Sequence, residues 1–456
     1  NIYPIAKDLD GNPTAVDTNG DGEIQLSEAQ AIKFLNVYNG SIYNLQGISS
    51  FTNLEFLNIN SNPITSLNVS ALSNLKGLTC AYTQLTSLNV LALSNLKSLN
   101  CTANSFTNLN VSGLTNLQYL AFTNCTLLTS LNVSGCVSLQ NLWCPSNQLT
   151  GLDVSGLTNL QMLDCSQNQI ASLNVSGCSS LQKIQCQYNQ ISSLDVSSLT
   201  NLNILECYTN QMINLNTSSC FNLQSLACQD NQITSLDVSS LNNLQYLECY
   251  TNQIQSIDLS GFTNLIRLSC SNNQLTNLNV SGVSNLGYLN CINNQLPSLN
   301  ISDLNNLQVL YCSSNLISDI NFTNNPLLQI LFCGANNITS LDVSNLNNLT
   351  TLNCSNSSNL TYINMKNGSI ENSSSLNFSL CPNLEFICCD DAQLTQVQNL
   401  ITTYNYTNCG VSSLDCTYPF PNELSGNVKY DFWEDGCDVL DIVVPNVKYN
   451  VFDGTD

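Results

Sequence analysis

Oxygen-bearing side chains close to the N-terminus have the types and spacing of a calcium site. The five candidate ligands are Asp17, Asn19, Asp21, Glu23 and Glu28. The first three bring side-chain oxygens to one side of a turn, Gly22 permits a sharp bend, and the next residue offers its backbone carbonyl. The last glutamate closes the site with both carboxylate oxygens. We therefore expect calcium as a structural cofactor of an N-terminal cap, residues 1–31.

Two glutamates raise the question of acid–base catalysis. Glu206 and Glu248 hold the same place in two copies of the segment Glu-Cys-Tyr-Thr-Asn-Gln. Two repeats of a stacked fold would separate their backbones by about 9.6 Å, which suits a glycosidase that inverts configuration. An open surface, however, offers no pocket to raise the pKa of either acid. The chain also has no histidine, which excludes Ser/His/Asp, Cys/His and His-containing zinc sites. We expect no enzyme activity.

The charge balance excludes several classes of partner. The 456 residues include 9 Lys+Arg against 31 Asp+Glu, a formal net charge of −22. Such a chain lacks the basic clusters that bind nucleic acid or an anionic lipid surface. No run of about 18 apolar residues is present, so we expect no membrane insertion. The N-terminus, Asn1-Ile2-Tyr3-Pro4, has no signal-peptide features, and we expect that a signal peptide has already been removed.

One pattern, L-x-x-L-x-C-x-x-N-x-[LI], recurs along most of the chain. Its copies begin at Leu54, Leu75, Leu96, Leu117, Leu139, Leu160, Leu181, Leu202, Leu223, Leu244, Leu265, Leu286, Leu307, Leu328 and Leu349. The step is 21 residues, except for 22 between Leu117 and Leu139. A degenerate first copy begins at Ile32 and a last copy at Leu384. The pattern predicts about 17 coils over residues 32–395.

This pattern resembles the leucine-rich repeat family, and most closely the short, nested bacterial class called IRREKO. The two Leu and the Cys point inward from a short strand, and parallel stacking of the coils builds one core. The spacing recurs in the second half of each unit, as in Leu275-x-x-Leu278-x-Val280. The resemblance implies a curved, mainly β repeat solenoid. It has parallel strands on the concave face and short extended or 3₁₀ segments on the convex face.

The asparagine of the pattern is expected to form a ladder of amides after the strands. Its members are Asn62, Asn104, Asn147, Asn168, Asn189, Asn210, Asn231, Asn252, Asn273, Asn294, Asn315 and Asn336. Each amide can satisfy buried backbone groups at the bend. The ladder is broken at Thr83, Cys125, Ser357 and Ala392, where we expect a looser turn.

Cysteine is unusually frequent, with 23 residues. Fourteen of them take the inward position of the pattern. One interpretation is a metal or disulfide ladder, and the other, which we favour, is a column of small buried hydrophobes. Parallel neighbours point the same way, which is poor disulfide geometry. Near the C-terminus we expect a Cys409–Cys416 bridge that closes a cap, residues 396–420.

The segments at the two ends carry further resemblances. The N-terminal loop resembles an EF-hand calcium loop, although Pro4, Gly11 and Pro13 disfavour an entering helix and only a short exiting helix, Ser27 to Leu35, is expected. A paired calcium sensor is disfavoured, and a vestigial loop is the alternative. Residues 421–456 resemble the incomplete start of a Cna-B-like or SdrD-B-like β-sandwich. This combination resembles surface proteins of Bacteroidota, which commonly use type IX secretion. It implies an extracellular, outer-membrane-associated location.

Aromatic and acidic side chains are predicted to face the concave side. The candidate ligand-binding residues are Tyr119, Trp143, Tyr188, Glu206, Tyr208, Tyr246, Glu248, Tyr250, Tyr288, Tyr311 and Phe332. Exposed aromatics beside carboxylates suit a protein hot spot or sugar stacking. We expect an adhesin-like binding module for a protein or glycan. The alternative is a subunit or cargo of an outer-membrane complex for secretion, gliding or nutrient uptake, with a β-barrel membrane protein as partner.

Overall fold

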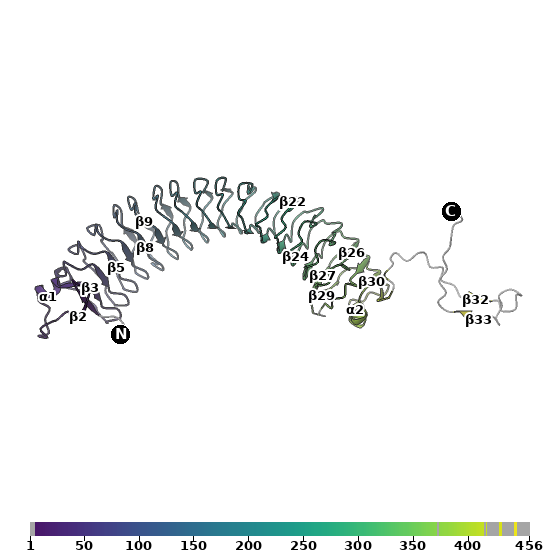
Figure 1. Cartoon of the computed structure of the whole chain (residues 1–456), viewed down its shortest axis with the longest axis horizontal. Coiled ribbons are helices and arrows are strands. Elements are labelled where there is room, and N and C mark those ends of the chain that lie inside the picture. Colours follow the sequence, from purple (N-terminus) through teal and green to yellow (C-terminus); the bar gives the residue numbers. More distant parts are fainter. Residues whose placement is uncertain (1–4, 372–373, 415, 417–427, 431–441, 445–456) are drawn as a thin grey trace.

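The protein is a curved solenoid whose coils stack side by side into an arc (Figure 1). The computed structural model describes residues 5–371, 374–414, 416, 428–430 and 442–444. The concave side carries a 19-stranded sheet, in which all strands except β1 and β2 run parallel. The predicted mainly β repeat solenoid with concave parallel strands is therefore confirmed.

Seventeen short strands, one from each coil, line the concave side. They are β3 (Ile32–Asn36), β4 (Phe56–Asn58), β5 (Gly77–Thr79), β6 (Ser98–Asn100), β8 (Tyr119–Ala121), β10 (Asn141–Trp143), β12 (Met162–Asp164), β14 (Lys183–Gln185), β16 (Ile204–Glu206), β18 (Ser225–Ala227), β19 (Tyr246–Glu248), β21 (Arg267–Ser269), β23 (Tyr288–Asn290), β24 (Val309–Tyr311), β25 (Ile330–Phe332), β27 (Thr351–Asn353) and β29 (Leu376–Asn377). Equivalent residues face each other across neighbouring strands, as in Leu247 opposite Leu268. The central residue of each three-residue strand, leucine in all but β14, where it is Ile184, is buried, so the residues on either side of it point outward.

The second half of most units forms another short strand, on the convex side. These strands are β7 (Asn108–Asn110), β9 (Ser130–Asn132), β11 (Gly151–Asp153), β13 (Ser172–Asn174), β15 (Ser193–Asp195), β17 (Asn214–Asn216), β20 (Ser256–Asp258), β22 (Asn277–Asn279), β26 (Ser340–Asp342), β28 (Tyr362–Asn364), β30 (Phe386–Cys388) and β31 (Gly410–Ser412). They pair in small sheets of two or four strands instead of one continuous sheet. Extended segments therefore predominate on the convex side of the described chain.

The asparagine ladder joins each coil to the coil before it. The side-chain oxygen of Asn252 accepts the backbone N–H of Ile233 at 2.9 Å. Its amide nitrogen donates to the carbonyl of Cys228 in the preceding coil, at 3.0 Å, and to that of Cys249 in its own coil, at 3.1 Å. Equivalent bonds recur at Asn273, one coil further along. One buried amide thus replaces the backbone partners that the bend removes.

The expectation of a looser turn where the ladder is broken is wrong at Thr83, Cys125 and Ser357, whereas Ala392 lies in a 3₁₀ helix, Asp391–Gln393, instead of the regular turn. The residue before the ladder position is left-handed in ordinary coils, with φ of 53° at Thr251, and it keeps φ of 54° at Tyr82 and 56° at Asn124. At the first break, the hydroxyl of Thr83 lies 2.9 Å from the carbonyl of Cys80. Small polar substitutes and the neighbouring coils preserve the backbone path.

The cysteines of the pattern are core side chains. Cys186, Cys228 and their equivalents are fully buried and carry free thiols. Burial raises the pKa of these two thiols to about 12. No cluster of three or more acidic, cysteine or histidine side chains that could hold a metal occurs in the described part of the chain. The thiols therefore serve as small apolar groups.

The N-terminal cap contains β1 (Ala6–Asp8), β2 (Pro13–Thr14) and α1 (Leu26–Gln30), and η1 (Ile48–Ser50) follows the first concave strand. The exiting helix is shorter than the predicted Ser27–Leu35. The reason is that Ile32–Asn36 forms β3, which pairs with β1 and β4. In this way the edge of the concave sheet is covered by the antiparallel β1.

The last predicted repeat belongs to the other face. The segment from Leu384 forms β30, which pairs with the convex β28, and the last concave strand is β29. Both halves of a unit have the same spacing of apolar residues. The 21-residue step is lost between Leu349 and Leu384, so the segment from Leu384 is the second, convex half of a unit instead of the first, concave half. The end is covered by η2 (Asp391–Gln393) and α2 (Leu394–Thr403), which buries Val397 and Ile401.

The predicted Cys409–Cys416 disulfide is wrong, because Cys416 is bonded to Cys388 and Cys409 carries a free thiol. The partly buried Cys409 precedes β31 and packs against the core. After β31 the chain turns back, and the hydroxyl of Tyr362 donates to the carbonyl of Cys416 at 2.7 Å. This return brings Cys416 to Cys388 at the end of β30.

Of the predicted sandwich, the structure describes only β32 (Val428–Tyr430) and β33 (Ile442–Val444), which pair antiparallel. The rest of residues 421–456 lies outside the described residues. Within the described residues, no helix is long and apolar enough to cross a membrane.

Loss of a single amide from the asparagine ladder should strongly reduce stability. Asn252→Ala should lower the free energy of unfolding by about 2–4 kcal/mol, because several buried backbone groups lose their partner. The control is Asn243→Ala, which removes one exposed bond to the carbonyl of Phe221 and should cost about 1 kcal/mol or less. Equal losses in urea denaturation would contradict a special role of the buried ladder.

Burial also predicts inert thiols. At about pH 8 the buried cysteines of the repeat pattern should resist alkylation in the native protein and react fully after denaturation. The thiolate is the reactive form, and burial disfavours it. Mass spectrometry of the labelled peptides measures each site. Rapid native labelling of Cys186 or Cys228 would show that the column is accessible to solvent.

Candidate binding surface

All eleven concave candidates lie on the concave strands or in the turn that follows them. Tyr188, Tyr208 and Tyr250 occupy the turn, and the other eight occupy strands. Trp143, Tyr188 and Tyr246 are the most open, with 37%, 48% and 43% of their surface exposed. The structure does not bring all eleven into one site. It arranges ten of them in three groups along the arc, and Tyr246, between Ser225 and Arg267 on the adjacent strands, belongs to none of these groups.

The first group is a pair on neighbouring strands. The rings of Tyr119 on β8 and Trp143 on β10 meet edge to face, with centroids 5.3 Å apart and an interplanar angle of 82°. Partial burial raises the pKa of Tyr119 above its ordinary value. This pair presents a fixed, partly exposed aromatic surface.

The second group, the central cluster, consists of Tyr188, Glu206, Tyr208, Glu248 and Tyr250. The rings of Tyr188 and Tyr208 meet edge to face at 5.4 Å. Partial burial raises the pKa of Tyr208. The nearby Tyr188 and the carboxylate of Glu206 raise it further, by smaller amounts. Tyr250 and Glu248 contribute to the same rise, so the other four side chains all lie within electrostatic range of Tyr208.

The third group, the C-terminal row, consists of Tyr288, Tyr311 and Phe332. Their successive ring centroids are 5.8 and 5.0 Å apart. The guanidinium of Arg267 lies 3.7 Å from the ring centroid of Tyr288. Its Nε also lies 3.2 Å from an oxygen of Glu248. Arg267 therefore links the central cluster to the C-terminal row.

Sequence reasoning missed the basic partners of the two glutamates. Lys183 lies 3.7 Å from Glu206, and Arg267, the only arginine of the chain, pairs with Glu248. Their positions in the repeat could have revealed them. Each base begins a concave strand, and its glutamate ends the adjacent concave strand. A pairing rule across adjacent coils would have found both ion pairs.

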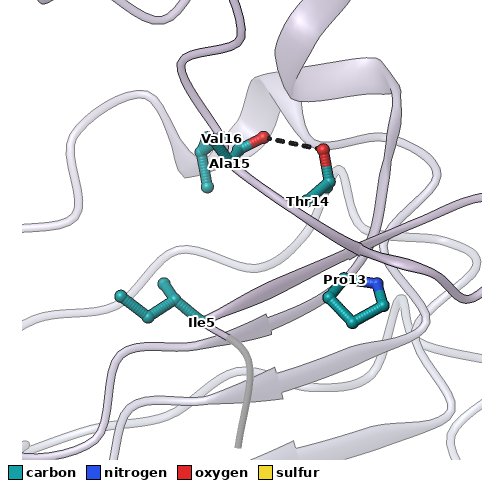
Figure 2. Close-up of a pocket in the computed structure, with 5 residues that line it drawn as sticks. All are labelled: Ile5, Pro13, Thr14, Ala15 and Val16. Atoms are coloured by element: carbon teal, nitrogen blue, oxygen red, sulfur yellow. Dashed lines mark hydrogen bonds between the residues drawn. The ribbon is translucent and has the colours of Figure 1, made fainter.

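Each of the two glutamates is held in its own ion pair. Glu206 is held by Lys183 and by the amide of Gln185 at 3.0 Å. A cavity of about 600 Å³ lies elsewhere, in the N-terminal cap. Figure 2 shows its lining, which is Ile5, Pro13, Thr14, Ala15 and Val16. This lining holds no acid or base, so the cavity offers no catalytic group.

The predicted calcium loop is closed by its last glutamate. One oxygen of Glu28 accepts the backbone N–H of Thr18 at 2.7 Å and that of Asn19 at 3.2 Å, and the other accepts that of Gln25 at 3.0 Å. Hydrogen bonds, the largest effect coming from the hydroxyl of Thr18, lower the pKa of Glu28 to about 2. Glu28 is thus an ionised, preorganised carboxylate.

The first two acids of the loop also turn toward its backbone. Asp17 accepts the N–H groups of Gly20 and Gly22 at 2.6 and 2.9 Å, and Gly22 has φ of +89°. Asp21 accepts the N–H of Glu23 at 2.9 Å. The ligand set is all oxygen, as calcium prefers, although the described acids are not gathered into a ready-made metal cluster. Calcium would therefore act on a loop that is already folded.

Comparisons with known proteins agree with this architecture. A family model described as Leucine Rich repeats (2 copies) matches residues 137–177 and 222–261. The functional domain of InlJ from Listeria monocytogenes, which includes a cysteine ladder, is 31% identical, with a TM-score of 0.57. The match covers 75% of this chain and 71% of that one.

Two further solved structures share the fold. A leucine-rich repeat protein of Leptospira interrogans is 22% identical with a TM-score of 0.54, over 85% of this chain and 97% of that one. The Toll–Spatzle complex of Drosophila is 19% identical with a TM-score of 0.53, over 75% of this chain and 50% of that one. No curated protein sequence matches the chain. The repeat pattern, the stacked coils and the match to InlJ lead to one conclusion: the chain belongs to the leucine-rich repeat family.

Proposed function

We propose that this chain is a non-catalytic, extracellular binding module that recognises a protein through its concave face. The observation that carries this proposal is the series of partly exposed Tyr, Trp and Arg side chains along the inner strands. These residue types dominate the binding energy of protein interfaces. Glycan recognition is the alternative for the same surface.

The distribution of charge supports the choice of face. Five of the six basic residues of the solenoid, residues 32–395, lie in or directly beside concave strands: Lys33, Lys76, Lys97, Lys183 and Arg267. The sixth, Lys366, follows the convex strand β28. Within residues 32–365, seven acids lie away from the concave strands, from the residues directly beside them and from the turns that follow them: Asp153, Asp195, Asp237, Asp258, Asp303, Asp319 and Asp342. The concave face carries both signs of charge, whereas the rest of the coils is mainly acidic. A mixed-charge aromatic face fits a protein partner better than a uniformly anionic one.

The proposed location also has chemical support. The Cys388–Cys416 disulfide fits an oxidising, extracellular environment. Association with an outer membrane, as a surface adhesin or as part of an envelope complex, extends this proposal. The test is an affinity pull-down from detergent-solubilised outer membranes of the source cell, in calcium. A stoichiometric β-barrel partner would favour an envelope complex, and an empty pull-down would favour an adhesin whose ligand lies outside the cell.

Concave variants should separate binding from folding. Trp143→Asn, Tyr246→Ser and Tyr311→Asn each copy a residue that another coil has at the same position, namely Asn290, Ser225 and again Asn290. Each variant should weaken capture of the partner by about tenfold or more, as expected for hot spots. The measurement is surface plasmon resonance with the captured partner.

The matched control is Phe221→Thr, which copies Thr200 and changes a ring that is 54% exposed but lies outside the concave sheet. It should leave affinity unchanged. Loss of binding in this control but not in the concave variants would place the interface elsewhere.

We also propose that Asp17, Asn19, Asp21, Glu23 and Glu28 bind a structural calcium ion. In about 1 mM calcium the wild type should melt at a higher temperature than in chelator, since a ligand that binds only the folded loop stabilises it. Asp17→Ala should abolish this difference and keep the far-ultraviolet circular dichroism of the solenoid. An identical melting temperature of the wild type with and without chelator would refute the calcium site.

A further inference from the structure

Two carboxylates belong to the central cluster, those of Glu206 and Glu248, and a third, that of Asp230, lies beside it. Only the third has no basic partner among the described residues. Glu206 pairs with Lys183, and Glu248 pairs with Arg267. Asp230 lies between them in the chain and belongs to the intervening coil. No lysine or arginine of the described chain lies within ion-pair distance of its carboxylate. The cluster therefore keeps one uncompensated negative charge, at Asp230.

Tyrosines of the two adjacent coils lie beside this charge. The backbone N–H of Asp230 donates to the carbonyl of Tyr250 at 3.0 Å, and Tyr208 belongs to the coil before it. Tyr188 is 48% exposed and meets Tyr208 edge to face at 5.4 Å. Tyr250 lies within electrostatic range of Asp230, Glu248 and Tyr188, which all raise its pKa after the larger effect of partial burial. The negative face of a tyrosine ring attracts a cation, and a neighbouring carboxylate strengthens that attraction.

Two buried carbonyl oxygens in the same turns lack a hydrogen-bond donor. Gln187 and Gln229 are only 9% and 5% exposed, and their side-chain oxygens have no partner among the described residues. The turn position that they occupy is taken by Tyr208 and Tyr250 in the alternate coils. The side chain of Gln229 also acts to lower the pKa of Tyr250, which places it near that ring. Two buried acceptors of these turns therefore have no donor within the described part of the chain.

We propose that Asp230, with the rings of Tyr188, Tyr208 and Tyr250, forms a subsite for a lysine or arginine side chain of the protein partner. This proposal rests on the proposed function and names the chemistry that the concave face recognises. The ammonium or guanidinium pairs with Asp230 and lies against the rings. Its N–H groups donate to the carboxylate of Asp230. A neutral sugar would supply donors too, but it would not compensate the charge of Asp230.

The chain offers a well-matched pair of variants. Asp230→Asn removes the charge at a left-handed position, with φ of 55°, that asparagine already occupies at Asn272 and Asn293 with φ of 54°. Asp237→Asn removes the same charge from the same coil, but on its exposed convex side, and asparagine occupies the equivalent place at Asn279. A third variant, Tyr188→Ser, copies Ser146 and Ser314, which hold the same turn position. All three should fold normally.

The probes are short blocked peptides of glycine and serine with one central arginine, lysine, citrulline or norleucine. The full chain is labelled with carbon-13 in its tyrosine rings, and the ring signals of Tyr188, Tyr208 and Tyr250 are followed by NMR. The arginine and lysine peptides should shift these signals, and added salt should weaken the effect. Asp230→Asn should weaken binding about threefold to fivefold, Tyr188→Ser should also weaken it, and Asp237→Asn should leave it unchanged.

Equal binding of the arginine and citrulline peptides, or undiminished binding to Asp230→Asn, would overturn the proposal. Shifts of the same signals by a neutral oligosaccharide, without any by the arginine peptide, would overturn it in favour of a sugar site. Failure of the subsite can be distinguished from failure of the proposed function. If the concave variants lose the partner but the peptides do not bind, only the subsite fails. If the peptides bind as expected but no partner depends on the concave face, only the proposed function fails.

Discussion

The hydrogen bonds of one buried asparagine per coil are the interaction on which the rest of the architecture depends. At Asn252 the amide joins the backbone of its own coil to that of the coil before it. The bend after each strand leaves buried backbone groups without partners, and this amide supplies those partners. The left-handed residue before it, such as Thr251, has nearly the same φ in coil after coil. The result is a constant register between successive strands.

Because the register between successive strands is constant, the place of a residue in the repeat determines where it lies on the concave face. Residues at one place in the repeat become neighbours on adjacent strands, about 4.8 Å apart. Rings therefore meet edge to face in rows, and Arg267 reaches both Glu248 and Tyr288. The core needs only the leucines and cysteines, so the outward positions of the concave strands are free to vary. That freedom explains how one stable scaffold can carry a surface with a particular charge and aromatic pattern.

The periodic features were predictable from sequence because each is repeated many times. The concave strands, the asparagine ladder and the concave position of Trp143 or Tyr246 all follow from the 21-residue step. Features that occur once were not predictable. The segment from Leu384 was assigned to the wrong face, because both halves of a unit have the same spacing. The Cys388–Cys416 bridge depends on a return of the chain after β31 that no repeat specifies. The ion pairs of Lys183 and Arg267 depend on contacts between adjacent coils.

Hydroxyl-radical footprinting of the purified complex with the captured partner would test the central claim, recognition through the concave face, most directly. The reagent oxidises exposed aromatic side chains, and mass spectrometry reads each site in the free and bound protein. The account predicts that partner binding protects Trp143, Tyr188 and Tyr246, while Phe221 is oxidised to the same extent in both states. Protection of Phe221 with unchanged oxidation of the three concave residues would contradict it.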